Sequence, residues 1–248
     1  MDNFNVYKDI QARTKGEIYI GVVGPVRTGK STFIKRFMEL AVLPAMEDES
    51  LKAVSTDELP QSAGGKTVMT TEPKFIPKEA VQITLGDGIQ AKVRLIDCVG
   101  YMVDGAAGHV ENGEERMVKT PWSEKEIPFT QAAQIGTRKV IGDHSTIGIV
   151  VTTDGSVGEL KRSAYIDAEK QTVDELKKLG KPFILLLNST KPYSDETLKL
   201  AEQLAADYGV TVLPVSCEQL KKEDIFHILE SVLKEFPVTQ LDFHIPKW

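Results

Sequence analysis

The sequence predicts a three-layer α/β domain with a mainly parallel central sheet. Short apolar runs recur along the 248 residues, and segments with the periodicity of amphipathic helices separate them. This repeat places successive parallel strands in one sheet with helices on both faces. A chain of this length can also bury one substantial core. We therefore assign residues 1–236 to one domain, and residues 237–248 to a linker or the start of a following domain.

The expected elements alternate along the chain. The strands are expected at 17–23, 82–85, 92–96, 146–151, 183–187 and 210–215. A polar helical leader at 1–15 precedes helices expected at 30–42, 131–141, 163–179, 194–208 and 222–236. The turn Gly86-Asp87-Gly88 joins the second strand to the third as a hairpin, and Ser194-Asp195-Glu196 is a capping sequence that begins a helix.

Two segments do not fit this alternation. Residues 47–77 and 101–128 are polar and carry prolines and glycines, which predicts two long loops. Loops of this length inside a compact domain are usually functional.

Composition and charge exclude several classes of protein. Apolar residues make up 41% of the chain and charged residues 27%, which is typical of a globular protein. The net charge of −6 gives no basic surface for nucleic acid. Cys98 and Cys217 have no neighbouring Cys or His at metal-ligand spacing, so we expect reduced thiols and a cytosolic protein. Neither a membrane span nor a signal peptide is evident.

The stretch GPVRTGKS at 24–31 matches the phosphate-binding pattern G-x-x-x-x-G-K-[ST] in full. It follows an expected strand and opens an expected helix, so backbone N–H groups and the helix N-terminus can surround phosphates. Lys30 is expected to reach phosphate oxygens, and the Ser31 hydroxyl to coordinate Mg²⁺. The residues expected to contact nucleotide here are Gly24, Pro25, Val26, Arg27, Thr28, Gly29, Lys30, Ser31 and Thr32.

A second phosphate element, Asp97-Cys98-Val99-Gly100, ends the third expected strand. An aspartate there can hold Mg²⁺ and the Gly100 N–H can face the γ-phosphate. Thr70 and Thr71 lie in the first long loop, where switch NTPases place a threonine that closes over the metal and the γ-phosphate. The choice between these two threonines stays open. Thr71 is also a candidate metal ligand.

Two residues bear on the rate of hydrolysis. Many signalling GTPases carry a water-orienting Gln directly after Asp-x-x-Gly, whereas this chain has Tyr101, which predicts slow intrinsic hydrolysis or dependence on another group. Arg27 is one candidate for that group, because a guanidinium along the phosphates would neutralise charge in the transition state. A solvent-facing Arg27 that merely favours an anion is the alternative.

The base site departs from the guanine pattern. In LLLNSTKP, Asn188 is retained, but the Lys and Asp of Asn-Lys-x-Asp are missing. Without that Asp, guanine loses its strongest hydrogen-bond partner, which favours ATP. Asn188 is expected either to contact a purine or to cap the end of the strand. Ser216, in Pro214-Val215-Ser216-Cys217, fits the first position of the loop that lies under the base.

In this order the motifs GPVRTGKS, MTTEP, DCVG, NSTK and PVSC look like those of a switch-type P-loop NTPase related to the translation-factor GTPases. Two long stretches are more specific: QARTKGEIYIGVVGPVRTGKSTFIKRFMELAVLP and LIDCVGYMVDGAAGHVENGEERMVKTPW. With them the whole chain resembles the N-terminal nucleotide-binding region of the stage IV sporulation protein A family, coat morphogenetic proteins of endospore-forming bacteria.

This resemblance implies an ATPase that uses ATP and Mg²⁺ and polymerises with itself around the forespore, in the mother-cell cytoplasm. It also implies a small amphipathic membrane peptide, stage V sporulation protein M, and other coat proteins as partners, through regions that follow this one. It assigns phosphate and Mg²⁺ binding to Gly24, Gly29, Lys30 and Ser31, metal binding to Asp97, and γ-phosphate sensing to Thr70 or Thr71. Two alternatives remain: a GTPase switch with relaxed base specificity, and a scaffold that binds nucleotide with little hydrolysis.

Overall fold

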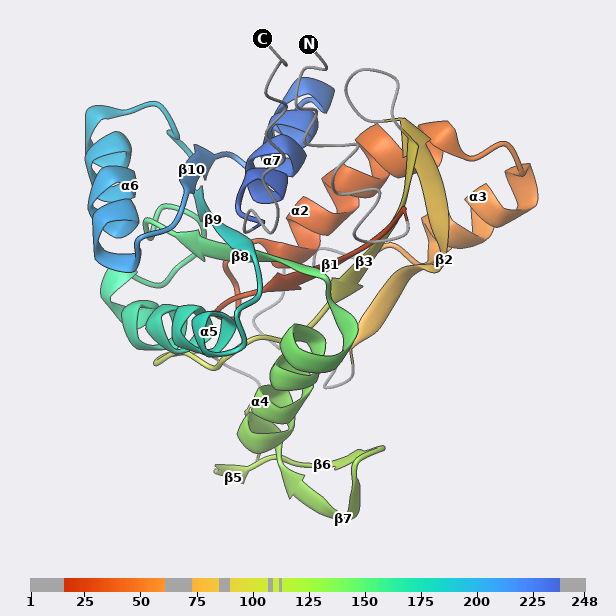
Figure 1. Ribbon diagram of the computed structural model, residues 1–248. Helices are drawn as coiled ribbons and strands as arrows, with labels where there is room; N and C mark the ends of the chain where they lie inside the picture. Colours follow the sequence, from red (N-terminus) through yellow and green to blue (C-terminus); the bar gives the residue numbers. More distant parts are fainter. Residues whose placement is uncertain (1–15, 61–72, 85–89, 107–108, 112, 237–248) are drawn as a thin grey trace, which may run out of the picture.

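The computed structural model describes residues 16–60, 73–84, 90–106, 109–111 and 113–236. Its centre is a six-stranded sheet, which confirms the predicted α/β architecture (Figure 1). Only the strand at one edge, Lys74–Thr84, is antiparallel to its neighbour. Across the sheet the order is β10 (Val212–Val215), β9 (Phe183–Asn188), β8 (Ile147–Thr153), β1 (Glu17–Val23), β3 (Gln90–Asp97) and β2 (Lys74–Thr84).

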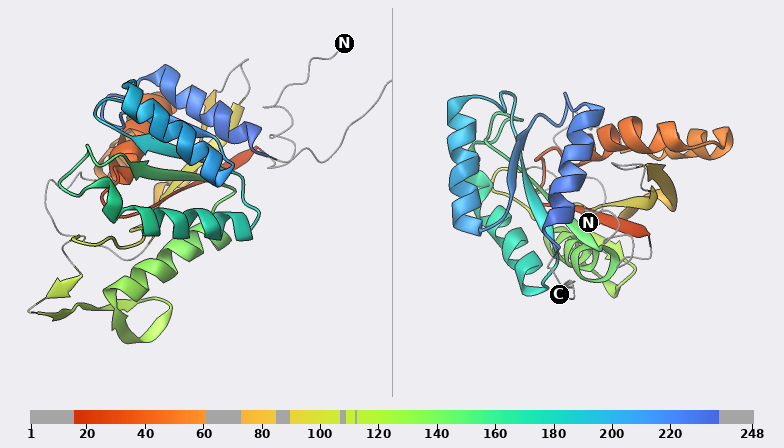
Figure 2. Two further views of the ribbon diagram at one scale, coloured as in Figure 1. Left: turned by 90° about the vertical axis from the view of Figure 1, so that its left-hand side faces the viewer. Right: turned by 45° about the horizontal axis from the view of Figure 1, so that its top comes forward.

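Helices cover both faces of this sheet (Figure 2). Alternating strand residues point to opposite faces, so Ile18, Ile20 and Val22 of β1 enter one core cluster and Val23 enters another. The first cluster contains α2 (Lys30–Phe37), the π turn η1 (Met38–Val42), the 3-10 turn η2 (Leu43–Ala45) and α7 (Lys222–Lys234). The second contains the π turn η4 (Val140–His144), which follows α4 (Phe129–Lys139), together with α5 (Ile166–Lys178) and α6 (Asp195–Tyr208).

The first expected long loop, 47–77, holds a helix and the start of a strand. Helix α3 (Glu49–Asp57) begins at Asp48, whose carboxylate accepts from the N–H groups of Ser50 and Leu51. Strand β2 starts before Pro77 and continues beyond it through a register shift between Ile76 and Val81. Pro is tolerated there because β2 is an edge strand. Thr70 and Thr71 lie outside the described residues.

The second expected long loop, 101–128, also differs from the prediction. It contains four short strands that pair as two hairpins: β4 (Val110–Glu111), β5 (Glu114–Glu115), β6 (Met117–Thr120) and β7 (Ser123–Pro128). We call these four strands the hairpin unit. It lies at the N-terminal end of α4, on the side remote from the central sheet (Figure 1). Its strands are joined by turns at Gly113 and Pro121. Glycine and proline mark hairpin turns and irregular loops alike, so the sequence pattern did not distinguish the two.

The remaining boundaries follow the sequence pattern closely. β1 covers the expected residues, β8 begins one residue later and ends two residues later than expected, and β9 ends one residue later. The Ser194 hydroxyl accepts from the Thr197 N–H and caps α6, as its sequence predicts. A 3-10 turn, η5 (Arg162–Ala164), precedes α5. The leader at 1–15 and the tail at 237–248 lie outside the described residues.

Candidate functional site

The phosphate loop joins β1 to α2 and is packed against β8. Three of its residues have positive φ: Gly24 (130°), Arg27 (63°) and Gly29 (98°). A Cβ on Gly24 would lie 2.3 Å from the carbonyl oxygen of Val151 in β8. Glycine is therefore required where the loop leaves β1, because backbone occupies the space of a side chain.

Lys30, at the start of α2, is buried within this loop. Its Nζ donates to the carbonyl oxygens of Pro25 (2.6 Å) and Gly24 (3.3 Å), and the Thr28 hydroxyl also donates to Pro25 (3.0 Å). Burial lowers the pKa of Lys30, and the neighbouring Asp97 carboxylate opposes that shift. The loop is thus closed on itself around the lysine that the motif assigns to phosphate.

Asp97 ends β3, and the parallel pairing of β3 with β1 brings it opposite Val22, beside the phosphate loop. Its Oδ2 accepts from the Ser31 hydroxyl at 3.4 Å, while its buried Oδ1 has no hydrogen-bond partner among the described residues. Burial raises the pKa of Asp97 to about 6, against the opposing effect of Lys30. The Ser31 hydroxyl and the Asp97 carboxylate are hard oxygen donors, which Mg²⁺ prefers as ligands. Their contact, beside the unpaired Asp97 Oδ1, therefore fits a Mg²⁺ site.

Gly100 approaches the phosphate loop most closely. It has φ 93°, and a Cβ there would lie 2.1 Å from the Gly24 carbonyl oxygen and 2.7 Å from Lys30 Nζ. The next residue is fixed by backbone, since the Val26 N–H donates to the Tyr101 carbonyl at 2.9 Å. The second phosphate element therefore lies directly on the first, as expected for residues that respond to one phosphate group.

The side chain of Tyr101 is 1% exposed and turns toward α5, where its hydroxyl donates to the Glu175 carboxylate. Burial and then the hydrogen bond to Glu175 raise the pKa of the phenol, so it stays the donor. Its ring packs in a core cluster with Val26, Val103 and Tyr165. In the position of a water-orienting Gln, this chain therefore has a residue anchored in the interior.

Asn188, at the end of β9, connects the phosphate loop to the loop after β10. Its Nδ2 donates to the Thr28 carbonyl and its Oδ1 accepts from the Cys217 N–H, both at 2.9 Å. A Cβ on Gly29 would lie 2.3 Å from that Nδ2. Both polar atoms of the Asn188 side chain thus have partners within the protein. A contact from Asn188 to a purine stays a prediction.

The other expected site residues have defined places but no tested role. Ser216 lies beyond β10, where its carbonyl accepts from the Gln219 N–H at 3.0 Å. Arg27 is half-buried in the phosphate loop, and Thr32 lies in the first turn of α2. Their contacts with nucleotide stay predictions.

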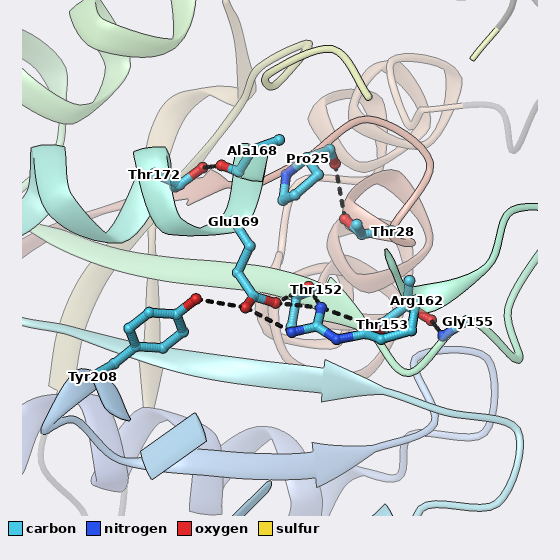
Figure 3. Close-up of polar contacts among 10 residues, drawn as sticks. All are labelled: Pro25, Thr28, Thr152, Thr153, Gly155, Arg162, Ala168, Glu169, Thr172 and Tyr208. Atoms are coloured by element: carbon cyan, nitrogen blue, oxygen red, sulfur yellow. Dashed lines mark hydrogen bonds and ion pairs between the residues drawn. The ribbon is translucent and has the colours of Figure 1, made fainter. Parts of the chain in front are cut away.

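A buried ionic network beside the site was not predicted. Glu169 of α5 is fully buried and accepts from Arg162 Nη2 (2.7 Å), from the Tyr208 hydroxyl (2.8 Å) and from the Thr152 hydroxyl (Figure 3). Arg162 Nη1 also donates to the Thr153 carbonyl at 3.3 Å. The network anchors the chain that follows β8. A signal was available, because Glu169 falls on the buried stripe of α5 with Ala168, Thr172, Val173 and Leu176.

This sheet order, together with a phosphate loop on which Asp97 and Gly100 converge, defines a P-loop NTPase domain. The model of the family described as "Stage IV sporulation protein A, ATPase domain" matches residues 1–237. The chain belongs to this family.

Curated relatives agree with this assignment. The chain is 52% identical over 248 residues to the stage IV sporulation protein A of Bacillus subtilis (strain 168) and to that of Bacillus anthracis. It is 52% identical over 246 residues to that of Clostridioides difficile (strain 630). The alignments cover 99–100% of this chain but 50% of each relative, so the chain spans about half their length. Within the described residues, every helix is too short or too polar to cross a membrane.

Proposed function

We propose that this chain is a Mg²⁺-dependent ATPase whose cycle drives self-assembly of a spore coat morphogenetic protein around the forespore. One observation carries the enzymatic part: Gly100 lies against both Gly24 and Lys30, beside the contact between Ser31 and Asp97. In this proposal, a phosphate cradle, a metal-binding pair and a γ-phosphate sensor meet at this point. The name of the matching family, an ATPase domain, supports the same reaction.

Each residue has a distinct role in this proposal. The Lys30 ammonium and the backbone N–H groups of residues 27–31 bind the phosphates. Ser31 and Asp97 hold Mg²⁺, which when bound would neutralise charge on the β- and γ-phosphates. The Gly100 N–H senses the γ-phosphate. Thr70 or Thr71 is proposed to complete this arrangement, and Arg27 to stabilise charge in the transition state.

The base loop supports ATP over GTP. Lys191 occupies the position at which a guanine-specific loop carries the Asp that pairs with the guanine N1–H and 2-amino donors. Ser189 occupies the position of the motif's Lys, and its hydroxyl accepts from the Lys191 N–H at 3.0 Å. A site without the matching acceptor loses its main discrimination for guanine.

Phosphate release from Mg-ATP and Mg-GTP, measured side by side, tests this proposal. We expect turnover of ATP, lower kcat/KM for GTP, and loss of both signals in Lys30→Ala. A strong preference for GTP would support the relaxed GTPase switch instead. Nucleotide binding without phosphate release would support the scaffold. Activity that persists in Lys30→Ala would identify a contaminating enzyme.

The assembly part rests on the family and needs its own test. Proposed partners are further copies of the same protein, the small amphipathic peptide stage V sporulation protein M and other coat proteins, at the forespore surface in the mother-cell cytoplasm. Nucleic acid is not proposed as a partner, because the net charge is −6. Sedimentation of this chain with ATP or ADP, beside Lys30→Ala, is expected to give ATP-dependent pelleting. Equal sedimentation with ATP and with ADP, while ATP is hydrolysed, would overturn self-assembly by this chain.

A further inference from the structure

A chain of polar contacts runs from the phosphate loop to α4. It begins at Tyr101, whose carbonyl accepts from the Val26 N–H and whose hydroxyl donates to Glu175 of α5. Glu175 Oε1 also accepts from Arg138 Nε of α4 at 2.8 Å. One carboxylate therefore links the residue after Gly100 to the last turn of α4. We call Tyr101, Glu175 and Arg138 the clamp.

The backbone at Gly100 cannot move without moving the clamp. Tyr101 is tied at both ends, by its carbonyl to the phosphate loop and by its hydroxyl to α5. Gly100 precedes it directly and already touches Gly24 and Lys30. A displacement of Gly100 toward or away from a bound phosphate must therefore rotate Tyr101 or stretch its contact with Glu175.

The hydroxyl of Tyr101 is separable from its role in packing. Its ring fills space among Val26, Val103, Ala106 and Tyr165, which a Phe would fill equally well. The hydroxyl adds the hydrogen bond to Glu175. The far end of the clamp is loosely held, because the Arg138 side chain is 58% exposed and exposed ion pairs add little stability. Such a pair can break and reform without threatening the fold.

We propose that Tyr101 is a positioning residue: through Glu175 it fixes Gly100 over the phosphate loop, and through Arg138 it couples the nucleotide site to the hairpin unit. This inference rests on the proposed function. The hairpin unit is where this coupling would be felt, because β7 runs directly into α4. Arg116, between β5 and β6, also lies over the Phe129 ring of α4 at 4.8 Å. Next to Arg138, Lys139 lies 5.9 Å from the Trp122 ring.

The first test separates positioning from packing by kinetics. Tyr101→Phe is expected to keep a cooperative melting transition. Its affinity for ATP should stay within about twofold of the parent. It is expected to lower kcat about tenfold, the effect of one lost charge-assisted hydrogen bond on the barrier. Glu175→Gln keeps the shape of the side chain but not its charge. Its kcat should lie between those of Tyr101→Phe and the parent. Tyr193→Phe is the matched control, because Tyr193 is 79% exposed.

The second test reads the coupling at Trp122. The chain has two tryptophans, so Trp248→Phe leaves Trp122 as the sole emitter in its band. We expect its emission to differ between ADP and a non-hydrolysable ATP analogue. This difference should be lost in Tyr101→Phe and in Arg138→Ala, while nucleotide binding measured by calorimetry is retained.

The outcomes distinguish this inference from the proposed function. Binding without hydrolysis in the parent would overturn the ATPase, yet the emission difference would still test the clamp. Hydrolysis with unchanged kcat and unchanged emission in Tyr101→Phe would overturn the clamp alone. Absence of nucleotide binding in the parent would overturn both. A Tyr101→Phe chain that loses its melting transition would show that the hydroxyl is structural, which also overturns a positioning role.

Discussion

At the scale of single residues, glycines determine how closely three backbone segments approach one another. Gly24 lies against β8, and Gly100 lies against Gly24, with no room for a Cβ at either place. Positive φ alone does not distinguish such positions. Gly113 has φ 86°, and none of the described residues lies within 4 Å of a Cβ built on it. Gly100 has φ 93°, and a Cβ there would lie 2.1 Å from the Gly24 carbonyl oxygen.

This contrast makes a matched pair of substitutions. Gly113→Ala should lower the free energy of unfolding by about 1–2 kcal/mol, the strain of an L residue at positive φ. Gly100→Ala should cost about 1–3 kcal/mol more because of overpacking, and should weaken ATP binding at least tenfold. Urea unfolding and calorimetric titration measure the two effects. Equal unfolding midpoints for both variants would contradict the close contact.

A second residue gives a prediction on pH. Burial raises the pKa of the Cys217 thiol to about 12, above the value of about 8.5 expected in the unfolded chain. Between these values the folded state keeps a proton that the unfolded state loses. The stabilisation is therefore complete below pH about 8.5 and is lost as pH rises, by about 1.4 kcal/mol per pH unit. In urea unfolding from pH 7 to 10, the free energy of unfolding should decline less steeply for Cys217→Ala than for the parent. Equal declines in the two proteins would contradict the raised pKa of Cys217.

At the scale of elements, the Glu169 network joins β8, α5 and α6. Thr152 belongs to β8 and Tyr208 ends α6, and both donate to one carboxylate that Arg162 also binds. The Glu169 side chain is 0% exposed and that of Arg162 19%. A pair this buried costs free energy to desolvate, so its effect appears when one partner is removed.

Glu169→Gln should therefore lower the free energy of unfolding by about 3 kcal/mol, since Arg162 is left without its counter-charge. Glu230→Gln on α7 is the control, because its i,i+4 pair with Lys234 is exposed and contributes about 0.5 kcal/mol or less. The double variant Arg162→Met with Glu169→Leu should recover part of the loss. Equal destabilisation by the Glu169 and Glu230 variants in urea would refute the role of the network.

At the scale of the whole molecule, the site is assembled from the ends of parallel strands. β1, β3 and β9 end at the phosphate loop, Asp97 and Asn188, and the loop after β10 reaches Asn188 through Cys217. Ligands of open α/β sheets bind at this edge for that reason. A nucleotide bound here would contact segments from most of the domain, so its binding energy should stabilise the whole fold.

Mg-ATP at 100 times its dissociation constant should add about 2.7 kcal/mol to stability. For a domain of this size the melting temperature should then rise by about 5–10 °C. Differential scanning fluorimetry measures the shift, which EDTA should reduce and Lys30→Ala should abolish. An equal shift with and without EDTA would show that binding does not depend on the metal.

The parts of the fold that could be predicted are those whose signals are local. The strands β1, β8 and β9 are buried apolar runs, and the phosphate loop is a contiguous motif with its glycines in register. Prediction failed where one sequence pattern is compatible with either a strand or a loop. Pro77 concealed the first half of β2 because a proline is excluded from a central strand but not from an edge strand. The polar hairpin unit has the composition of a loop.

By itself, the sequence determined the architecture, the phosphate-loop motif and the departure from the guanine motif, because each depends on neighbouring residues. Tertiary structure alone decided what Asn188, Tyr101 and Glu169 do. Asn188 bridges two loops, Tyr101 reaches a carboxylate 74 positions away, and Glu169 is buried against an arginine. These contacts depend on which helix or loop packs beside which strand. Side-chain contacts of that kind form only after the sheet has brought distant segments together.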